Sequence, residues 1–227
     1  MTVPVTELPL SFDWRTAKPN VVSPVRNQKD CGACYAFAFV SGLESYVALK
    51  TGERSMALSP QQLIDCSDNE GCEHGSNKKT FSYVQSHGMM AEIDYPYEES
   101  DAGKCRFKQS KVVARMDSRR QIRAKHEELR RAIVENGPVV AAFNGNVNKL
   151  DKWDPAAPYE DPECNPMDLN HVVLVIGFGV TDDGTAFWVI QNTWGEQWGD
   201  EGYLRLKSNA ATCDCGLLRD AYAFTRR

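Results

Sequence analysis

The sequence lacks the features that mark membrane proteins and nucleic-acid-binding proteins. None of its apolar runs approaches the roughly 18 residues that a membrane-spanning helix needs, because glycines interrupt runs such as "VVLVIGFGV". It also lacks an excess of basic residues: the formal charge is −5, whereas a nucleic-acid binder normally carries a basic patch or stripe. With 42% hydrophobic and 25% charged residues, the composition is that of an ordinary globular domain. We therefore expect no membrane span and no nucleic-acid partner.

Two signals of the secretory pathway are missing as well. The first residues, "MTVPVTELPL", lack the charged region and apolar core of a signal peptide, and no N-x-S/T glycosylation sequon occurs. Either the protein is cytosolic or an upstream segment has been removed. Its cysteines favour the second alternative, since they are spread along the chain as in a disulfide framework, which needs an oxidising compartment. They stand at positions 31, 34, 66, 72, 105, 164, 213 and 215.

Hydrophobic patterning predicts a first half that is mainly helical. A first long helix is expected over 29–49, and it has too many apolar positions for one stripe, so it should be buried on most sides. A second begins after Ser59, a good N-cap, and Gln62 completes a capping box with it. A third is expected over 78–86 and should end before Gly88.

The second half is predicted to be mostly β. One amphipathic helix over 126–136 is followed by strand-like runs, with a hairpin turn at "TDDG", residues 181–184. The strands are expected at 139–143, 172–178, 187–191 and 203–206. A helical half followed by a β half suggests an α+β protein with a cleft between the two halves.

The stretch "KDCGACYAFAF", residues 29–39, contains a C-x-x-C motif with several interpretations. A redox pair should follow a strand directly, but the preceding "SPVRNQKD" predicts a loop. A zinc site needs a second ligand pair, and only Cys213-x-Cys215 is available, at the wrong spacing. Both cysteines could be structural half-cystines. Alternatively Cys34 is a nucleophile at a helix start, where the helix dipole stabilises a thiolate.

A nucleophilic cysteine needs a histidine partner, and the chain has four histidines. His74 lies in a predicted loop and His87 precedes a helix-ending glycine. His126 lies among charges on a helix and is expected on a solvated face. His171 opens the apolar strand "HVVLVIGF", which would hold it rigidly with its ring free to face a cleft. A structural role for His171 remains the alternative.

Three longer blocks resemble the signatures of the papain family of cysteine proteases: "NQKDCGACYAF", "LNHVVLVIGFG" and "QNTWGEQWGDEGYLRL". "FDWR" at 12–15 resembles the start of the mature enzyme, and "GCEHG", "YPYE" and "CGLL" fall where the family has related segments. His171 lies 137 residues after Cys34, inside the range of roughly 130–150 noted for this class. The resemblance implies a papain-like two-lobed α+β fold, with a helical lobe at 20–113 and a β-barrel-like lobe at 114–227. Residues 1–19 would pack on the β lobe, and together they would form one catalytic domain with the cleft between the lobes.

The resemblance also assigns catalytic roles. Cys34 would be the nucleophile, its thiol ionising easily beside the His171 imidazolium, and Asn192 would orient the imidazole. Gln28, six residues before Cys34, would donate to the oxyanion. Trp194 would shield the bond between Asn192 and His171 from water. Without the flanking blocks, Gln28 and Asn192 would be read as surface amides, and Trp194 as a core aromatic.

Three disulfides are implied by the family: Cys31–Cys72, Cys66–Cys105 and Cys164–Cys215. This pairing leaves Cys34 free and Cys213 spare. Cys213 and Cys215 could exchange roles, and Cys215 is preferred because "CG" there matches the family's segment.

A substrate-binding wall and a specificity pocket are implied by position. The segment "GCEHGSN" would supply Gly75 to an extended substrate, and His74 would narrow that wall. Asp220 would form the floor of the pocket for the residue preceding the scissile one, so that basic residues are accepted beside apolar ones. The alternative is that Asp220 is a surface carboxylate. Besides Asp220, the pocket would be lined by Ser76, Asn77, Ala142, Leu169 and Val172. Asn170 and Trp194 complete the predicted substrate-contacting set.

Two departures from the family pattern stand out. Tyr35 replaces the usual tryptophan, which we expect to be harmless. Segment 151–163, "DKWDPAAPYEDPE", is acidic and rich in proline, and it is expected as a solvated surface loop or as a wall on the leaving-group side.

The resemblance as a whole predicts a cathepsin L-like cysteine endopeptidase that acts on polypeptides without metal or cofactor. An exopeptidase or a non-catalytic binding homologue is the alternative. An inhibitory pro-segment and cystatin-like inhibitors are the implied partners of a monomer. Its expected location is a lysosome-like acidic vesicle or the extracellular space.

Overall fold

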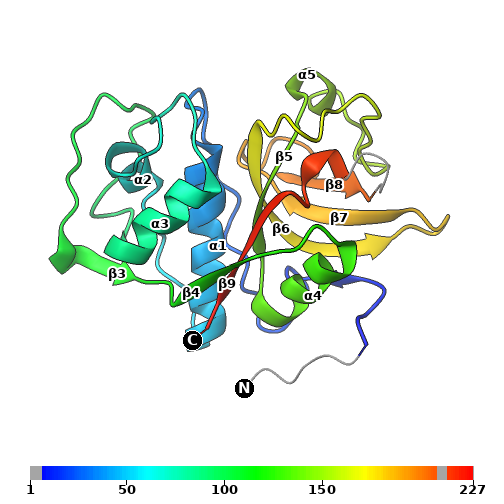
Figure 1. Cartoon of the computed structure of the whole chain (residues 1–227), viewed down its shortest axis with the longest axis horizontal. Helices are drawn as coiled ribbons and strands as arrows, with labels where there is room; N and C mark the ends of the chain where they lie inside the picture. Colours follow the sequence, from blue (N-terminus) through cyan, green and yellow to red (C-terminus); the bar gives the residue numbers. More distant parts are fainter. Residues whose placement is uncertain (1–6, 209–213, 227) are drawn as a thin grey trace.

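The first three helices of the chain gather in one half of the molecule, and the long strands lie in the other half together with the last two helices, as the computed structural model of residues 7–208 and 214–226 shows (Figure 1). The predicted α+β class with a helical and a β lobe is confirmed. The helices are α1 (Cys34–Thr51), α2 (Pro60–Cys66), α3 (Asn77–His87), α4 (His126–Asn136) and α5 (Val147–Leu150), with short 3-10 turns η1 (Gln109–Lys111) and η3 (Asp214–Gly216). The strands are β1 (Phe12–Asp13), β2 (Met89–Met90), β3 (Val112–Ala114), β4 (Ser118–Gln121), β5 (Val139–Phe143), β6 (His171–Val180), β7 (Ala186–Gln191), β8 (Tyr203–Lys207) and β9 (Asp220–Thr225).

Helix α1 begins five residues later than its apolar pattern predicts. The predicted start at Lys29 is wrong, because this residue has a φ of 52° and belongs to a turn. The segment before the helix is tied to another loop by the Cys31–Cys72 disulfide, and Gly32 N donates to Cys72 O at 2.8 Å. A Cβ at position 32 would lie 2.4 Å from that oxygen, so only glycine fits. The turn places Cys34 at the first position of the helix.

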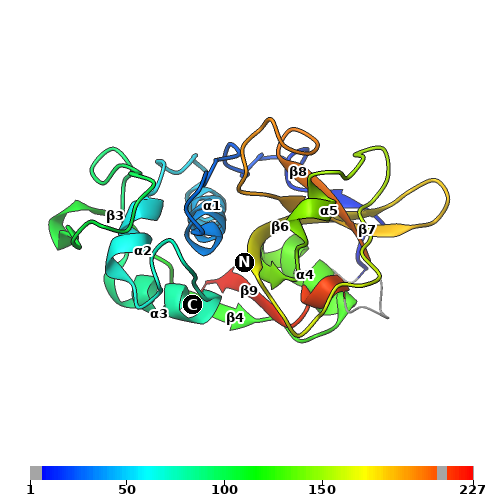
Figure 2. The ribbon, with the colours of Figure 1, turned by 90° about the horizontal axis from the view of Figure 1, so that it is seen from above.

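The burial predicted for α1 is confirmed, because the helix lies between the other helices and the β lobe (Figure 2). Phe39 contacts Phe81 of α3 with ring centroids 4.8 Å apart and Phe224 of β9 at 5.4 Å. At Gly42 an added Cβ would meet the side chains of Phe224 and Val140 at 2.9 Å. This close approach joins the helical lobe to the sheet through one apolar core.

Only one of the two hydrogen bonds of the predicted capping box forms at the start of α2. Ser59 caps the helix as expected, accepting from Gln62 N at 3.0 Å. The Gln62 side chain does not return the bond; its Oε1 accepts from Met90 N at 2.7 Å and its Nε2 donates to Gly88 O at 3.0 Å. Because Gln62 is fully buried, its amide satisfies backbone groups that have no access to water.

The other predicted helices agree closely with the structure. Helix α3 extends one residue beyond the predicted 78–86 at each end, and α4 has the predicted bounds. The residue after each helix is a glycine with positive φ, Gly88 and Gly137. Within the described residues, no helix is long and apolar enough to cross a membrane.

One seven-stranded sheet forms the β lobe, with antiparallel neighbours in the order β4-β9-β5-β6-β7-β8 and β1 paired with β6. The predicted strands correspond to β5, β6, β7 and β8, extended by at most two residues at either end. The predicted hairpin connects β6 and β7, where Gly184 N donates to Thr181 O at 2.9 Å. Strands β4 and β9 are not predicted from the sequence; β4 forms one edge of the sheet, β9 pairs with it, and both cross toward the helical lobe (Figure 1).

Candidate active site

The cysteines divide into bonded pairs and one free thiol. The disulfides Cys31–Cys72, Cys66–Cys105 and Cys164–Cys215 form as predicted. Among the described residues Cys34 is the free cysteine, while Cys213 lies outside them. Since Cys31 is bonded to Cys72, the C-x-x-C motif is neither a redox pair nor half of a zinc site.

The sulfur of Cys34 lies where the first helix meets the sheet. Cys34 is the first residue of α1, and its Sγ accepts from Val172 N of β6 at 3.4 Å. Val172 follows His171 directly, so the contact brings the thiol to the strand end that carries the imidazole. The two residues are far apart in sequence, and the packing of α1 against β6 brings them together.

The His171 imidazole is held by an amide. Its Nε2 lies 2.7 Å from Asn192 Oδ1, and the same oxygen accepts from Thr193 N at 2.9 Å. A carbonyl oxygen can only accept, so the neutral ring carries its proton on Nε2 and leaves Nδ1 as the basic nitrogen. Both His171 and Asn192 are buried, with 7% and 4% of their surface exposed.

The Trp194 ring lies against the imidazole. The rings of His171 and Trp194 lie 4.8 Å apart between centroids, at an interplanar angle of 31°. Trp194 in turn meets Trp198 edge to face at 5.0 Å. This aromatic cover limits the access of water to the His171–Asn192 bond.

Gln28 is a buried amide and not a surface one. Its Nε2 donates to Cys31 O at 2.9 Å, and its Oε1 accepts from the Thr193 hydroxyl. Because an amide nitrogen carries two hydrogens, the bond to Cys31 leaves one N–H for a further acceptor. Gln28 O also accepts from the Tyr97 hydroxyl at 2.6 Å. These contacts hold the amide in the turn that leads to Cys34.

Burial disfavours the thiolate form of Cys34 and the imidazolium form of His171 when each group is considered alone. Burial raises the pKa of the Cys34 thiol, and the backbone N–H groups of Val172 and Tyr35 oppose this rise with a smaller effect. Burial also lowers the pKa of His171 to about 4, against the hydrogen bond to Asn192, which raises it. For the thiol without a neighbouring charge, desolvation outweighs the backbone donors, so easy ionisation of Cys34 stays a prediction that depends on a His171 imidazolium beside it.

Three of the predicted pocket residues, Ala142, Val172 and Asp220, lie on adjacent strands. In the sheet register, Ala142 of β5 pairs with Val172 of β6 on one side and with Asp220 of β9 on the other. Asn77 of α3 donates through Nδ2 to Asp220 Oδ2 at 2.9 Å, across the boundary between the lobes. The structure thus brings these four residues together.

Asp220 is half-buried, and burial disfavours the charged form of its carboxyl group. Desolvation raises its pKa, while hydrogen bonds from Asn77 and Tyr222 act in the opposite direction. The Oδ1 atom of Asn77 is buried without a hydrogen-bond partner in the structure. The carboxylate is therefore not an ordinary solvated surface group.

The remaining predicted substrate-contacting residues lie on two segments beside these strands. Gly75 packs against the Tyr35 ring so closely that a Cβ would lie 2.3 Å from it, and Ser76 caps α3. Leu169 is half-buried, and the exposed Asn170 accepts through Oδ1 from Gly145 N at 2.8 Å.

His74 and Tyr35 are the two side chains at which the sequence departs from the family pattern near the predicted cleft. His74 is exposed on its loop. The Tyr35 hydroxyl donates to Gly71 O at 2.9 Å, and the ring supports the segment that carries Gly75. The substitution at position 35 thus preserves a buried aromatic support.

His126 was expected on a solvated face, and this expectation is wrong. Its Nε2 lies 2.9 Å from Asp214 Oδ2, and its ring stacks at 9° on Trp188 with centroids 6.0 Å apart. Trp188 Nε1 donates to the same Asp214 oxygen at 2.9 Å. Asp214 and Trp188 are buried while His126 is half-buried, and this cluster is separate from the residues around Cys34.

Two further residues, Thr193 and Tyr97, position Gln28 and were not identified from the sequence. Thr193 donates to Gln28 Oε1 and its N–H contacts Asn192, and Tyr97 donates to Gln28 O. Both lie inside the family-like blocks, "QNTWGEQWGDEGYLRL" and "YPYE". Their position there was the one available signal, since an isolated Thr or Tyr indicates no role.

Comparison with known sequences places this geometry in a family. Residues 8–225 match the family described as "Papain family cysteine protease". Cysteine proteinase 3 of Dictyostelium discoideum is 36% identical over 219 residues, which are 94% of this chain and 63% of that protein. The cathepsin L-like proteinase of Phaedon cochleariae is 38% identical over 202 residues, 87% of this chain and 60% of that protein. The chain therefore spans less than two thirds of the length of these relatives.

Solved structures agree with the sequence comparison. Digestive procathepsin L 3 of Tenebrio molitor larval midgut superposes with a TM-score of 0.88 at 34% identity, over 99% of this chain and 73% of that chain. The bromelain protease from Ananas comosus, in complex with the E64 inhibitor, gives 0.85 at 30% identity over 97% of this chain and 100% of that chain. Fold, site geometry and sequence agree over almost the full length, and the chain belongs to the papain family of cysteine proteases.

Proposed function

We propose that this chain is a cysteine endopeptidase that hydrolyses peptide bonds through a thioester acyl-enzyme. The observation that carries the proposal is the contact of Cys34 with the start of β6, where His171 is bonded to Asn192. A nucleophile, a base and a residue that orients the base stand in the order that covalent acyl transfer requires.

The reactive form is a thiolate–imidazolium pair. Each charge alone is disfavoured by burial, so the proton passes from Cys34 to His171 Nδ1 and the two charges offset one another's desolvation. Asn192 accepts from Nε2 throughout and stabilises the protonated ring. A neighbouring imidazolium lowers the pKa of a cysteine thiol, because its positive charge stabilises the thiolate.

Acylation begins with attack of the sulfur on the scissile carbonyl carbon. The negative charge that develops on the carbonyl oxygen is bound by the free N–H of Gln28 Nε2 and by Cys34 N. His171 Nδ1 gives its proton to the leaving amine as the carbon–nitrogen bond breaks, and a thioester remains. In deacylation Nδ1 takes a proton from water, the hydroxide attacks the thioester, and the proton returns to the departing sulfur.

The half-buried Asp220 supports a preference for basic residues in the pocket beside Ala142 and Val172. A carboxylate that is partly removed from water discriminates strongly in favour of a cationic side chain. We propose that Arg and Lys are accepted there together with apolar residues, and that Gly75, Ser76 and Asn77 bind the extended substrate opposite Leu169 and Asn170.

The partners and the location that we propose are based on the similar structures and on the disulfides. We propose an inhibitory pro-segment, because a procathepsin is among the similar structures, and inhibition by cystatin-like proteins and by E64, with which bromelain was solved. The disulfides support an oxidising compartment, either an acidic vesicle or the extracellular space, and we propose a monomer. The helical lobe at 20–113 and the β lobe at 114–227 would act as one catalytic domain.

The deciding experiment combines labelling and hydrolysis. Iodoacetamide at mildly acidic pH should alkylate Cys34 rapidly, and a peptidyl-coumarin substrate should be cleaved with E64-sensitive turnover. A library of blocked peptides distinguishes an endopeptidase, which cleaves internal bonds, from an exopeptidase, which needs a free end. Slow labelling together with no hydrolysis would identify a binding homologue instead.

A further inference from the structure

A chain of aromatic contacts leads from the catalytic imidazole to the acidic loop at 151–163. Trp194 contacts His171 in a tilted ring pair, Trp198 meets Trp194 edge to face, and Trp153 lies 6.3 Å from Trp198 between ring centroids. Trp153 belongs to the segment that the sequence analysis left between a solvated loop and a wall of the site. Its ring contact with Trp198 links that segment to the active site.

The Trp153 ring is held in place by its own loop. Its Nε1 donates to Ala157 O at 2.8 Å, while Asp151 Oδ1 accepts from Trp198 Nε1 at 3.3 Å. An added Cβ on Gly199 would lie 3.4 Å from the edge of the Trp153 ring. The ring is nevertheless half-exposed, so one part of it is fixed and another part is open to a ligand.

The loop itself is anchored to the β lobe at its far end. Tyr159 is buried, and its N–H donates to Arg205 O of β8 at 2.6 Å. Lys149 Nζ binds the buried Asp161 at 2.6 Å and the exposed Glu163 at 2.7 Å. Anchored on both sides of Trp153, the loop can present the ring at a fixed position.

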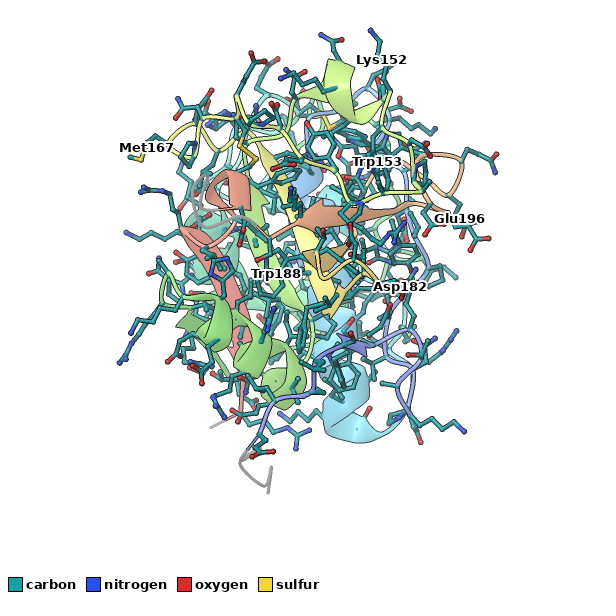
Figure 3. The ribbon with its side chains drawn as sticks, turned by 90° about the vertical axis from the view of Figure 1, so that its right-hand side faces the viewer. Lys152, Trp153, Met167, Asp182, Trp188 and Glu196 are labelled. Carbon is teal, nitrogen blue, oxygen red and sulfur yellow. A yellow bond between two sulfur atoms is a disulfide. The ribbon has the colours of Figure 1, made fainter. Side chains whose placement is uncertain are left out.

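Exposed carboxylates surround the aromatic chain. Asp151 and Asp154 flank Trp153 in the sequence, and Glu196 and Asp200 flank Trp198; all four are exposed. Lys152 is the cation of this stretch, and in Figure 3 it lies at the top of the β lobe, with Trp153 and Glu196 below it. Exposed carboxylates therefore lie on both sides of the ring, together with Lys152 and with Arg205, whose Nη2 donates to Pro155 O.

The direction of the aromatic chain identifies the part of the substrate it can meet. In the proposed mechanism His171 protonates the leaving amine, so the leaving segment begins beside the imidazole that Trp194 covers. The centroids of successive rings are 4.8–6.3 Å apart, and an extended peptide advances about 3.3 Å per residue. Trp153 is then within reach of a side chain about two to four residues after the scissile bond.

We infer that Trp153 is a specificity-determining residue that binds an Arg or Lys side chain on the leaving-group side of the substrate. The indole face attracts the cation, and the carboxylates of Asp151 and Asp154 add charge complementarity while repelling acidic substrates. The inference rests on the proposed peptidase function, and it concerns the side of the scissile bond opposite to Asp220.

The test uses internally quenched peptides that share one sequence before the scissile bond. Arg, norleucine or Glu is placed in turn at each of the first four positions after the bond, and mass spectrometry confirms the cleavage site. At one of positions two to four, we expect Arg to raise kcat/KM about two- to fivefold over norleucine, as an exposed cation–aromatic contact would, and Glu to lower it.

Variants then test whether the Arg preference depends on the Trp153 ring and on the neighbouring carboxylate of Asp154. W153A should abolish the Arg-to-norleucine ratio, W153F should keep part of it, and D154N should reduce it. Because the ratio compares two peptides on one protein, partial misfolding of a variant does not imitate the result. As a matched control, Y83A removes a half-buried aromatic from α3 in the other lobe and should leave the ratio unchanged.

Two outcomes would overturn the inference: equal turnover of the Arg and norleucine peptides by the unmodified chain, or an Arg preference that survives W153A. A peptidyl-coumarin substrate, which has no residue after the scissile bond, separates this from the proposed function. If the unmodified chain cleaves the coumarin substrate but shows no Arg preference in the peptides, the inference about Trp153 is wrong and the peptidase proposal stands. If it cleaves neither, the peptidase proposal itself fails.

Discussion

The backbone N–H of Val172 donates to the sulfur of Cys34 at 3.4 Å, which ties the proposed nucleophile to the strand that begins with His171. The contact does not by itself create a thiolate, because burial raises the pKa of the thiol and lowers that of His171 to about 4. The reactivity of the site therefore depends on both charges forming together.

This interdependence predicts a change in the pH profile of alkylation. In the unmodified chain, iodoacetamide should label Cys34 at a rate that stays high into the mildly acidic range, because the thiolate is paired with imidazolium. In H171A the thiol loses its partner and keeps only the effect of burial, so labelling should rise only above the ordinary thiol pKa of about 8.5. Rates measured by mass spectrometry across the acidic and alkaline ranges give the comparison. Superimposable profiles for the two proteins would contradict the ion pair.

Gln28 provides a separate test of transition-state stabilisation. Q28A removes one of the two donors to the oxyanion, and we expect kcat to fall about 10²–10³-fold. Alkylation of Cys34 forms no oxyanion, so its rate should change little. A parallel loss of alkylation would mean that Gln28 acts by holding the turn through Cys31 and Thr193 and not by donating to the substrate.

The charge of Asp220 should set the preference for basic residues in the pocket beside it. D220N keeps an acceptor for Asn77 but removes the charge, and we expect the preference for Arg over Leu at that substrate position to fall about tenfold. Because burial raises the pKa of Asp220, the preference in the unmodified chain should fade as the pH falls, at a higher pH than for an ordinary Asp. Peptides varied at that position, assayed from neutral to acidic pH, measure both effects. A preference unaltered by D220N would exclude Asp220 from the pocket.

His126 predicts a pH dependence of stability that is unrelated to catalysis. Its pKa is raised by the hydrogen bond to Asp214, against burial and the charge of Arg130. A histidine with a raised folded-state pKa contributes stability that is fully present below its unfolded pKa of about 6.5 and is lost as the pH rises through the folded value. Thermal unfolding of a C34A background, which cannot digest itself, should therefore show a decline in this range that H126Q flattens. Equal slopes for the two proteins would show that the pair does not couple folding to pH.

The errors of the sequence analysis around His126 and Gln62 have a common physical origin. Charged neighbours along α4 indicated a solvated His126, but its partner Asp214 arrives from a distant turn that the chain's pattern does not reveal. Gln62 has the spacing of a capping box, yet the backbone of Met90 captures its amide. In both cases a tertiary contact outweighs a correct local pattern.

The proposed catalytic residues could be selected from the sequence because their signals are local and resemble the pattern of a family. Cys34 and His171 sit in blocks that specify a helix start and a strand start, and the packing of α1 on β6 follows from the apolar character of both. The pKa direction at Cys34 could not be predicted, since it depends on how completely the folded lobes remove the sulfur from water. Strand β9 was missed because its short "DAYAFT" run is stabilised by pairing with β4 and β5.

The disulfide next to the nucleophile should affect turnover as well as stability. C31A/C72A removes a crosslink between residues 41 positions apart, and we expect the free energy of unfolding to fall by about 2–5 kcal/mol. It also releases the turn in which Gly32 contacts Cys72 and Gln28 contacts Cys31, so kcat should fall too. C66A/C105A is the matched control, because its residues are 39 positions apart and are not in the turn that carries Gln28. It should lose a similar amount of stability in denaturant titrations while retaining turnover below its unfolding transition. If both double variants lost turnover equally under those conditions, the Cys31–Cys72 bond would have no specific role in holding Gln28 against Cys34.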